Sequence, residues 1–495
     1  MALAIFLLPK KPKGTCGNGI CDVNEKTNPN VCPLDCKSSG ENLAPKVSAE
    51  VSLSSPFGIH DPKVPSEKMK TIPAGTDLPQ DVANVGAKWV RYAGGEGLVW
   101  DLVEKKPGQY DWTRNDYLFS EAQKAGLNVI VVVNAFNKTD RSDVKFSPGN
   151  VPYGKPKNME KYLQFLQTAV ERYDGDGNGD APGSPIVNFW EVENEVDAPM
   201  FWKDTPENYA DLLKESYQTI KKANPRAVVS LAGMADPMEF PEKAIDFYSK
   251  ILTQLEKNKE NPNAKYFDLA GIHLYNFSNN QLDREKVLIK AFKELLSKYK
   301  YNIPIWLTET GDYSGKPFKP PLKSEKVQAE NLLKTYITSL SQGIEKIFWV
   351  TLTEWHKYAG LDNSVWDNVG MINNPQNDGD GSRKLSYFTF KKMAEILEGS
   401  DWRNIQVVQE KDGINIYKFS KNGKSIWVAW NDGGEKNIEI VGINSAQVKI
   451  TSAIPNSDAG KNVSDYSKAF SEATKEVKNA KILLDLNVPT FVEEK

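Results

Sequence analysis

Two short acidic motifs in the middle of the chain have the residue types needed for acid–base chemistry. The first is the run W-E-V-E-N-E, which ends in Asn194 and Glu195, and the second is I-W-L-T-E-T-G, which contains Glu309. Both lie at the end of an apolar run, as expected for a buried strand. Two facing carboxyl groups suit cleavage of a glycosidic bond. One can protonate the leaving oxygen while the other attacks the anomeric carbon or positions water.

Polar and aromatic residues that close other apolar runs could complete such a site. A positive charge at Arg91 can hold one glutamate ionised. Tyr275 can hydrogen-bond the nucleophile, and Trp349 can form a flat apolar floor for a sugar ring. For the tryptophans of the loops, core packing is the alternative interpretation. The residues that we expect to contact the substrate are Arg91, Asn194, His273, Tyr275, Trp349, Trp100 and Trp355.

Other glutamates compete for the catalytic roles. The period of two along a strand places Glu191 and Glu193 on the same face as Glu195. We expect Glu191 to be a structural carboxylate paired with Arg91, which leaves Glu193 as the rival acid. Glu354 is the rival of Glu309, with a loop or substrate contact as its expected role.

The elements that must position these residues alternate between strand and helix over residues 55–400. Nearly continuous apolar runs such as NVIVVV and KIFWVT are typical of strands buried on both faces of a parallel sheet. Eight strand–helix units predict a (β/α)8 TIM barrel, an α/β fold, with a doubly wound open sheet as the alternative. The predicted strands are 57–60, 89–92, 128–133, 187–192, 227–232, 269–274, 305–308 and 347–351.

The predicted barrel explains why the polar residues cluster. Active sites of such barrels lie at the C-terminal ends of the strands. Arg91 closes the second strand, Glu195 the fourth and Glu309 the seventh, so their side chains are expected to meet at one mouth.

These marks together resemble the clan A glycoside hydrolases. The resemblance covers the Asn-Glu pair after strand four, the glutamate of strand seven, and the arginine of strand two. It also covers the H-x-Y of strand six and the tryptophan of strand eight, which here are His273 with Tyr275 and Trp349. The run RYAGGEGLVWDLVEKKPGQYDW is similar to the second βα region of these enzymes.

The resemblance implies a retaining hydrolase in which Glu195 is the general acid/base and Glu309 the nucleophile. Asn194 would then bind the sugar 2-hydroxyl. The sequence departs from many family 5 members at Asn134–Asn137 and at Val196. We expect cleavage of a β-linked polysaccharide or oligosaccharide, by a β-1,4-glucanase or mannanase or by a family 39-like β-xylosidase. A non-catalytic carbohydrate-binding protein on the same fold is the alternative of a different class.

A third acidic motif, D-G-D-G-N-G-D, precedes the fourth strand. Its alternating oxygens mimic the first half of a calcium loop, although Pro185 stands where an EF-hand has glutamate. A structural calcium site and a flexible Asp-Gly turn are the two interpretations, and no cofactor is expected for catalysis. The candidate calcium ligands are Asp174, Asp176, Asn178 and Asp180.

The two ends of the chain differ from the barrel. After about residue 401, strand patterns and turn signals predict an antiparallel β-sandwich over 401–495. All four cysteines lie within 13–36, spaced C-x4-C-x10-C-x3-C. This favours a small module with two disulfides over a zinc site and resembles modules of exported proteins. Residues 1–12 look like the tail of a signal peptide, and 37–54 read as a linker, so we expect a secreted or cell-surface protein.

Composition narrows the partners. The chain has 62 basic and 65 acidic residues and a net charge of −3, which argues against nucleic acid or an anionic membrane as a partner. Only 3 histidines make a histidine-rich metal site improbable. The sequence indicates a globular protein with an uncharged partner such as a polysaccharide, and it specifies no oligomeric state.

Overall fold

The computed structural model describes residues 53–62, 79–140, 154–236, 241–277, 281–357, 361, 363–377, 380–433 and 436–495. Ser55–Lys495 forms one compact unit, which contains the barrel and the C-terminal sheets. The predicted segments 1–12 and 13–36, with all four cysteines, lie outside the described residues, as does the predicted linker up to residue 52. The domain boundaries proposed above therefore stay predictions.

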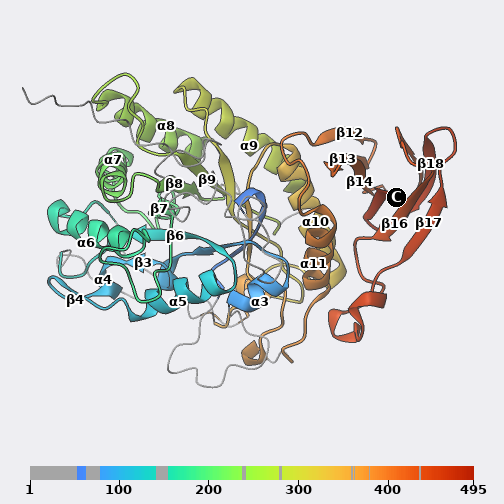
Figure 1. The fold of residues 1–495 in the computed structure, drawn as a ribbon, viewed down its shortest axis with the longest axis horizontal. Coiled ribbons are helices and arrows are strands. Elements are labelled where there is room, and N and C mark those ends of the chain that lie inside the picture. Colours follow the sequence, from blue (N-terminus) through green and yellow to red (C-terminus); the bar gives the residue numbers. More distant parts are fainter. Residues whose placement is uncertain are drawn as a thin grey trace, which may run out of the picture. The chain divides into compact units, whose positions relative to one another are not determined.

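The core of the unit is a closed barrel of eight parallel strands (Figure 1). Strand β2 pairs with β1 on one side and with β6 on the other, which closes the sheet and confirms the predicted TIM barrel. A short strand, β3 (Leu98–Val99), adds to the end of β6. The barrel strands are β1 (Phe57–His60), β2 (Trp89–Tyr92), β6 (Asn128–Asn134), β7 (Phe189–Val192), β8 (Val228–Met234), β9 (Leu269–Tyr275), β10 (Ile305–Gly311) and β11 (Ile347–Val350).

Helices surround the barrel because their apolar faces cover the outer face of the strands. Thr205 and Ser324 cap α7 and α10 by accepting a hydrogen bond from the third helical residue, as their side chains favour. None of the helices among the described residues is long and apolar enough to cross a membrane. The helices are α3 (Pro79–Asn84), α4 (Trp100–Val103), α5 (Thr113–Lys124), α6 (Met159–Arg172), α7 (Pro206–Ala223), α8 (Pro241–Lys257), α9 (Gln281–Lys298), α10 (Glu325–Ser341) and α11 (Leu385–Leu397).

Aromatic rings fill the N-terminal end of the barrel. Trp89 lies 4.9 Å from Phe189 and 5.2 Å from Trp306, measured between ring centroids. Phe348 completes the layer, and the absence of a side chain at Gly58 makes room for it, since a Cβ there would lie 2.6 Å from the Phe348 ring. This end is thus packed, and the polar residues are left to the opposite, C-terminal mouth.

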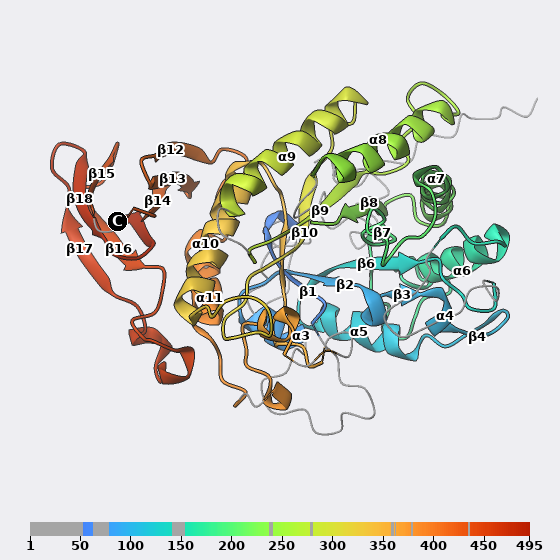
Figure 2. The same cartoon turned by 180° about the vertical axis from the view of Figure 1, so that it is seen from behind.

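The C-terminal region folds into antiparallel sheets, as predicted. The strands are β12 (Gln406–Lys411), β13 (Ile414–Lys421), β14 (Lys424–Asn431), β15 (Lys436–Val441), β16 (Gln447–Ser452), β17 (Glu472–Glu476), β18 (Lys481–Leu486) and β19 (Thr490–Glu494). Six of them form one sheet in the order β12-β13-β14-β19-β16-β17, while β15 pairs with β18. Both views show the sheets beside α10 and α11 (Figures 1 and 2). Ion pairs join the two parts, such as Lys334 Nζ to Asp432 Oδ1 at 2.8 Å.

The Asp-rich loop lies between α6 and β7, at the N-terminal end of the barrel. One carboxylate oxygen from each of Asp174, Asp176 and Asp180 lies within 4.8 Å of the others, a spacing suited to a metal ion. Asn178 instead donates its side-chain amide to Glu171 Oε1 at 2.9 Å. The calcium interpretation stays a prediction for the three aspartates and has no support here for Asn178.

If the three aspartates bind calcium, its removal should lower the melting temperature by several degrees, because an ion that binds only the folded state stabilises it. The chemistry should not change, since the loop lies at the end of the barrel away from the active-site mouth. Thermal unfolding with EDTA and with excess calcium measures this. A melting temperature indifferent to both would remove the site.

Candidate active site

A buried arginine connects the barrel strands at the mouth. Arg91, at the C-terminal end of β2, is fully buried and uses all five of its N–H groups. Two go to Glu191 at 2.7 and 2.9 Å, which confirms the predicted pairing. The others reach Glu309 at 2.8 Å, Asn194 at 2.7 Å and the His60 ring at 2.9 Å. Four side chains from the ends of three other strands thus converge on one guanidinium.

Glu309 on β10 is held by donors on both oxygens. Its Oε1 accepts from Arg91, and its Oε2 accepts from the Tyr275 hydroxyl at 2.5 Å. Its exposed fraction is 8%, so one edge of the carboxylate faces the mouth. His60 Nε2 lies 3.6 Å from Oε1. These contacts orient the carboxylate while leaving it accessible.

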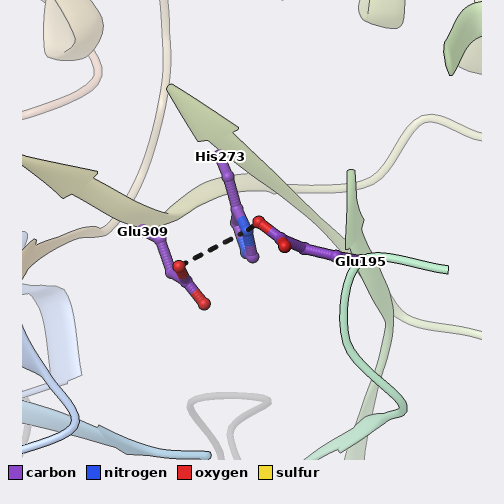
Figure 3. Close-up of side chains that lie close together, drawn as sticks. All are labelled: Glu195, His273 and Glu309. Carbon is purple, nitrogen blue, oxygen red and sulfur yellow. Dashed lines mark hydrogen bonds and ion pairs between the residues drawn. The ribbon is translucent and has the colours of Figure 1, made fainter. Parts of the chain in front are cut away.

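Glu195 lies opposite, with His273 between the two carboxyl groups. Figure 3 shows the three side chains pointing toward one another from separate strand ends. His273 Nδ1 is 2.7 Å from Glu195 Oε1 and 3.7 Å from Glu309 Oε2. One oxygen of Glu195 and one of Glu309 lie within 4.8 Å of each other. This upper bound agrees with the separation of about 5 Å in retaining glycosidases and lies below the roughly 6.5–9.5 Å of inverting ones.

The surroundings shift the pKa values of the two glutamates in opposite directions. Burial raises the pKa of Glu195, and the bond to His273 opposes this only in part. Burial would also raise the pKa of Glu309, but His273, Arg91 and the Tyr275 hydroxyl together hold it well below its usual range. One group is thereby set up to carry a proton and the other to stay ionised, the arrangement of an acid and a nucleophile.

The same three residues could in principle ligate a metal ion. Glu195, His273 and Glu309 each offer one ligand atom, and these three atoms lie within 4.8 Å of one another. Both oxygens of Glu309 already accept hydrogen bonds, however. Arg91 Nη1 lies 2.8 Å from Glu309 Oε1, so its positive charge would repel a metal cation bound there. The charge distribution favours the acid–nucleophile pair.

Two of the predicted sugar contacts are wrong. Trp349 is fully buried, and its register partner is Ile59, which packs with it in the layer between barrel and helices. The inward neighbour is Val350, in register with His60. Trp100 is 1% exposed and lies 5.9 Å from Tyr162 of α6, so it is a core residue.

An aromatic cluster at the mouth contains Tyr275 and Trp355, which were predicted, together with Phe277 and Trp366. Trp366 lies edge-on to Tyr275 at 4.9 Å and to Phe277 at 5.2 Å. Trp355, predicted as a contact, is 5.8 Å from Trp366 in the same cluster and is 7% exposed, so its role stays a prediction. The ring of Trp366 is partly exposed next to the tyrosine that holds Glu309. No strand pattern marks this residue, because it lies in a 3-10 turn, Val365–Asn368.

Glu354, the rival of Glu309 for the role of nucleophile, has a structural role, and so does His356 in the same loop. Glu354 pairs with Lys384 at 2.5 Å and accepts from Asn374 N at 3.0 Å, which anchors the loop after β11. His356 bonds Asn377 at 2.7 Å in that loop. His60 lies inside the site, and burial lowers its pKa to about 3, so it is neutral.

Comparison with known proteins agrees with this geometry. Residues 184–375 match the family model described as glycosyl hydrolase catalytic core, a range that includes Glu195 and Glu309. No curated protein matches the chain.

Solved structures share the fold. A family 39 glycoside hydrolase from Bacteroides cellulosilyticus WH2 aligns with a TM-score of 0.64 at 19% identity, over 90% of this chain and 82% of that one. A monomeric β-xylosidase from Caulobacter crescentus CB15 aligns with a TM-score of 0.59 at 14% identity, over 88% and 96%. An α-L-arabinofuranosidase from Thermotoga maritima gives 0.57 at 12% identity, over 88% and 95%.

The matched catalytic core and the closed barrel together support a glycosidase enzyme.

Gly233, at the end of β8, provides the space that His273 occupies. A Cβ at this position would lie 2.2 Å from His273 Nε2, and the ring is fully buried. We expect Gly233→Ala to displace the ring from Glu195 and to lower kcat/KM by roughly 10- to 100-fold with the fold retained. Gly433→Ala, whose Cβ would meet nothing closer than 3.4 Å, is the control. Wild-type kinetics for Gly233→Ala would contradict this role.

Proposed function

We propose that the chain is a retaining glycoside hydrolase that acts by double displacement, with Glu195 as general acid/base and Glu309 as nucleophile. The observation that carries the proposal is the pair of carboxyl groups, with oxygens within 4.8 Å, whose pKa values are shifted in opposite directions.

In the first step, Glu309 attacks the anomeric carbon while Glu195 gives its proton to the leaving glycosidic oxygen. In the second, Glu195 as carboxylate takes a proton from water, which displaces Glu309 from the sugar. Arg91 and Tyr275 keep Glu309 ionised and oriented before attack. Asn194, fixed by Arg91 through its Oδ1, has its side-chain N–H groups left to bind the sugar 2-hydroxyl.

Two substrate classes are proposed. A β-1,4-glucan or mannan fits the resemblance to family 5, and secretion would bring the enzyme to such polymers. A β-xyloside, cleaved from the chain end, is favoured by the similarity to a family 39 hydrolase and to a β-xylosidase. A panel of 4-nitrophenyl β-D-xyloside, β-D-glucoside, α-L-arabinofuranoside and β-cellobioside, with soluble glucan and mannan, separates them.

Loss of either glutamate should stop turnover without unfolding the protein. Glu195→Gln is expected to lower kcat by about 10²–10⁴-fold on unactivated substrates. Glu309→Gln should lower it by several orders of magnitude, because no covalent intermediate can form. Azide should rescue Glu309→Ala and yield a glycosyl azide of inverted configuration. Near-normal turnover in either glutamine variant would refute the assignment.

The dependence of kcat/KM on pH should be bell-shaped, because Glu309 must be ionised and Glu195 protonated. The lowered pKa of Glu309 keeps it ionised in acid, so activity falls only at low pH. The raised pKa of Glu195 keeps this group protonated to higher pH, and its ionisation sets the alkaline limb of the profile. Glu195→Ala, assayed with a 2,4-dinitrophenyl glycoside, should lose the alkaline limb alone. Persistence of this limb would assign it to another group.

A further inference from the structure

Glu193 is a carboxyl group at the mouth that the proposed mechanism does not use. It comes directly after β7, is 1% exposed, and has a backbone φ of +64°. A buried carboxyl group loses hydration, and left-handed backbone is strained for a residue with a side chain. Both are tolerated only where surrounding contacts compensate.

Those contacts all come from the end of strand β6. Glu193 Oε2 accepts from Asn134 Nδ2 at 2.7 Å, and Oε1 accepts from the Ala135 backbone N–H at 2.6 Å. The backbone N–H of Glu193 donates to Val133 O at 3.0 Å. Burial raises the pKa of Glu193 to about 7, and the bonds from Ala135 and Asn134 act in the opposite direction by stabilising the carboxylate.

The next two residues are held from other directions. Asn194 is fixed by Arg91, and the N–H of Glu195 donates to Gly233 O of β8 at 3.1 Å, with φ of +46° at Glu195. Three successive side chains therefore diverge, toward β6, toward Arg91 and toward His273. A strand would instead put residues 193 and 195 on one face. The turn is held between β6 and β8, and the Glu193 carboxylate accepts two of the three hydrogen bonds that join Glu193 to β6.

We propose that Glu193 is a positioning residue, which locks the turn after β7 and so sets the directions of Asn194 and Glu195. The inference rests on the proposed function, because it takes Glu195 as the general acid. A displaced acid harms only those substrates whose leaving group needs a proton, whereas damage to the fold as a whole slows all substrates alike.

The test compares phenyl and 2,4-dinitrophenyl β-D-xylosides, or the matching glucosides if the wild-type protein prefers glucose. Glu193→Ala should lower kcat/KM by roughly 10- to 100-fold on the phenyl substrate and by less than about 3-fold on the dinitrophenyl one. Glu193→Gln should recover most of the loss. Its amide oxygen can accept from Ala135 N–H, and its NH2 can donate to Asn134 after that amide turns over.

Glu285→Ala is the matched control. Glu285 is also 1% exposed and accepts a hydrogen bond, from Ser339, but it lies between α9 and α10. Its loss should lower the melting temperature while leaving the ratio of the two rates unchanged. An unchanged ratio in Glu193→Ala as well would overturn the proposal. If Glu193→Ala does not fold, Glu193→Asp replaces it, because the shorter carboxylate cannot reach both donors and a smaller change of the same kind is expected.

Glu195→Gln in the same assay separates this inference from the proposed function. If Glu195→Gln shows no dependence on the leaving group, the acid assignment itself fails. If it does and Glu193→Ala does not, only the positioning role fails. A crystal structure of Glu193→Ala gives a readout without turnover. Glu195 still at hydrogen-bond distance from His273, with Asn194 still on Arg91, would also overturn the inference.

Discussion

The site depends on one buried positive charge. Arg91 has no contact with solvent, so its charge must be balanced by the groups around it. The attraction between two buried charges offsets their loss of hydration only where the geometry of the pair is good and the remaining donors are hydrogen-bonded. The barrel meets this condition by bringing β1, β2, β7 and β10 to one point, where five hydrogen bonds use every N–H of the guanidinium. A lysine could not replace this fork of donors.

The same charge explains why two nearby glutamates behave differently. A single guanidinium faces Glu191 and Glu309 directly and is in contact with neither oxygen of Glu195. Glu195 is bonded instead to His273, and burial raises its pKa with Glu309 adding to the effect. The nucleophile thus contacts Arg91 and the Tyr275 hydroxyl directly, whereas the acid is bonded to His273.

Much of this architecture could be predicted from the sequence because it follows from local pattern. Apolar runs located β1 and β2 to the residue and the other barrel strands within about three residues, since burial on both faces leaves a continuous hydrophobic signal. The polar residues that end those runs come together, as the barrel requires. Strand β17 (Glu472–Glu476) carries no such signal, because all five of its residues are exposed and none is strongly apolar.

The predictions that failed concern the face of a strand to which a side chain points. This direction depends on tertiary contacts. Whether Trp349 faces the barrel or the helices depends on its register with β1, and its partner Ile59 faces the helices. The period of two similarly misplaced Glu193, because the strand ends at Val192 and the chain then enters two left-handed residues. Nothing in W-E-V-E-N-E marks these φ values. They are imposed by partners on β6 and β8 that are distant in sequence.

The left-handed backbone at residues 193 and 195 also explains how three consecutive residues after one strand can contact three different partners. An extended chain sends alternate side chains to opposite faces and would give the mouth only every second residue. The turn after β7 lets consecutive residues reach β6, Arg91 and His273 in sequence. Each left-handed residue costs about 1–3 kcal/mol, so the barrel must supply compensating contacts. The conformational cost of left-handed backbone thus falls at the position where the chemistry needs several side chains close together. The regular strands around this position supply the compensating contacts.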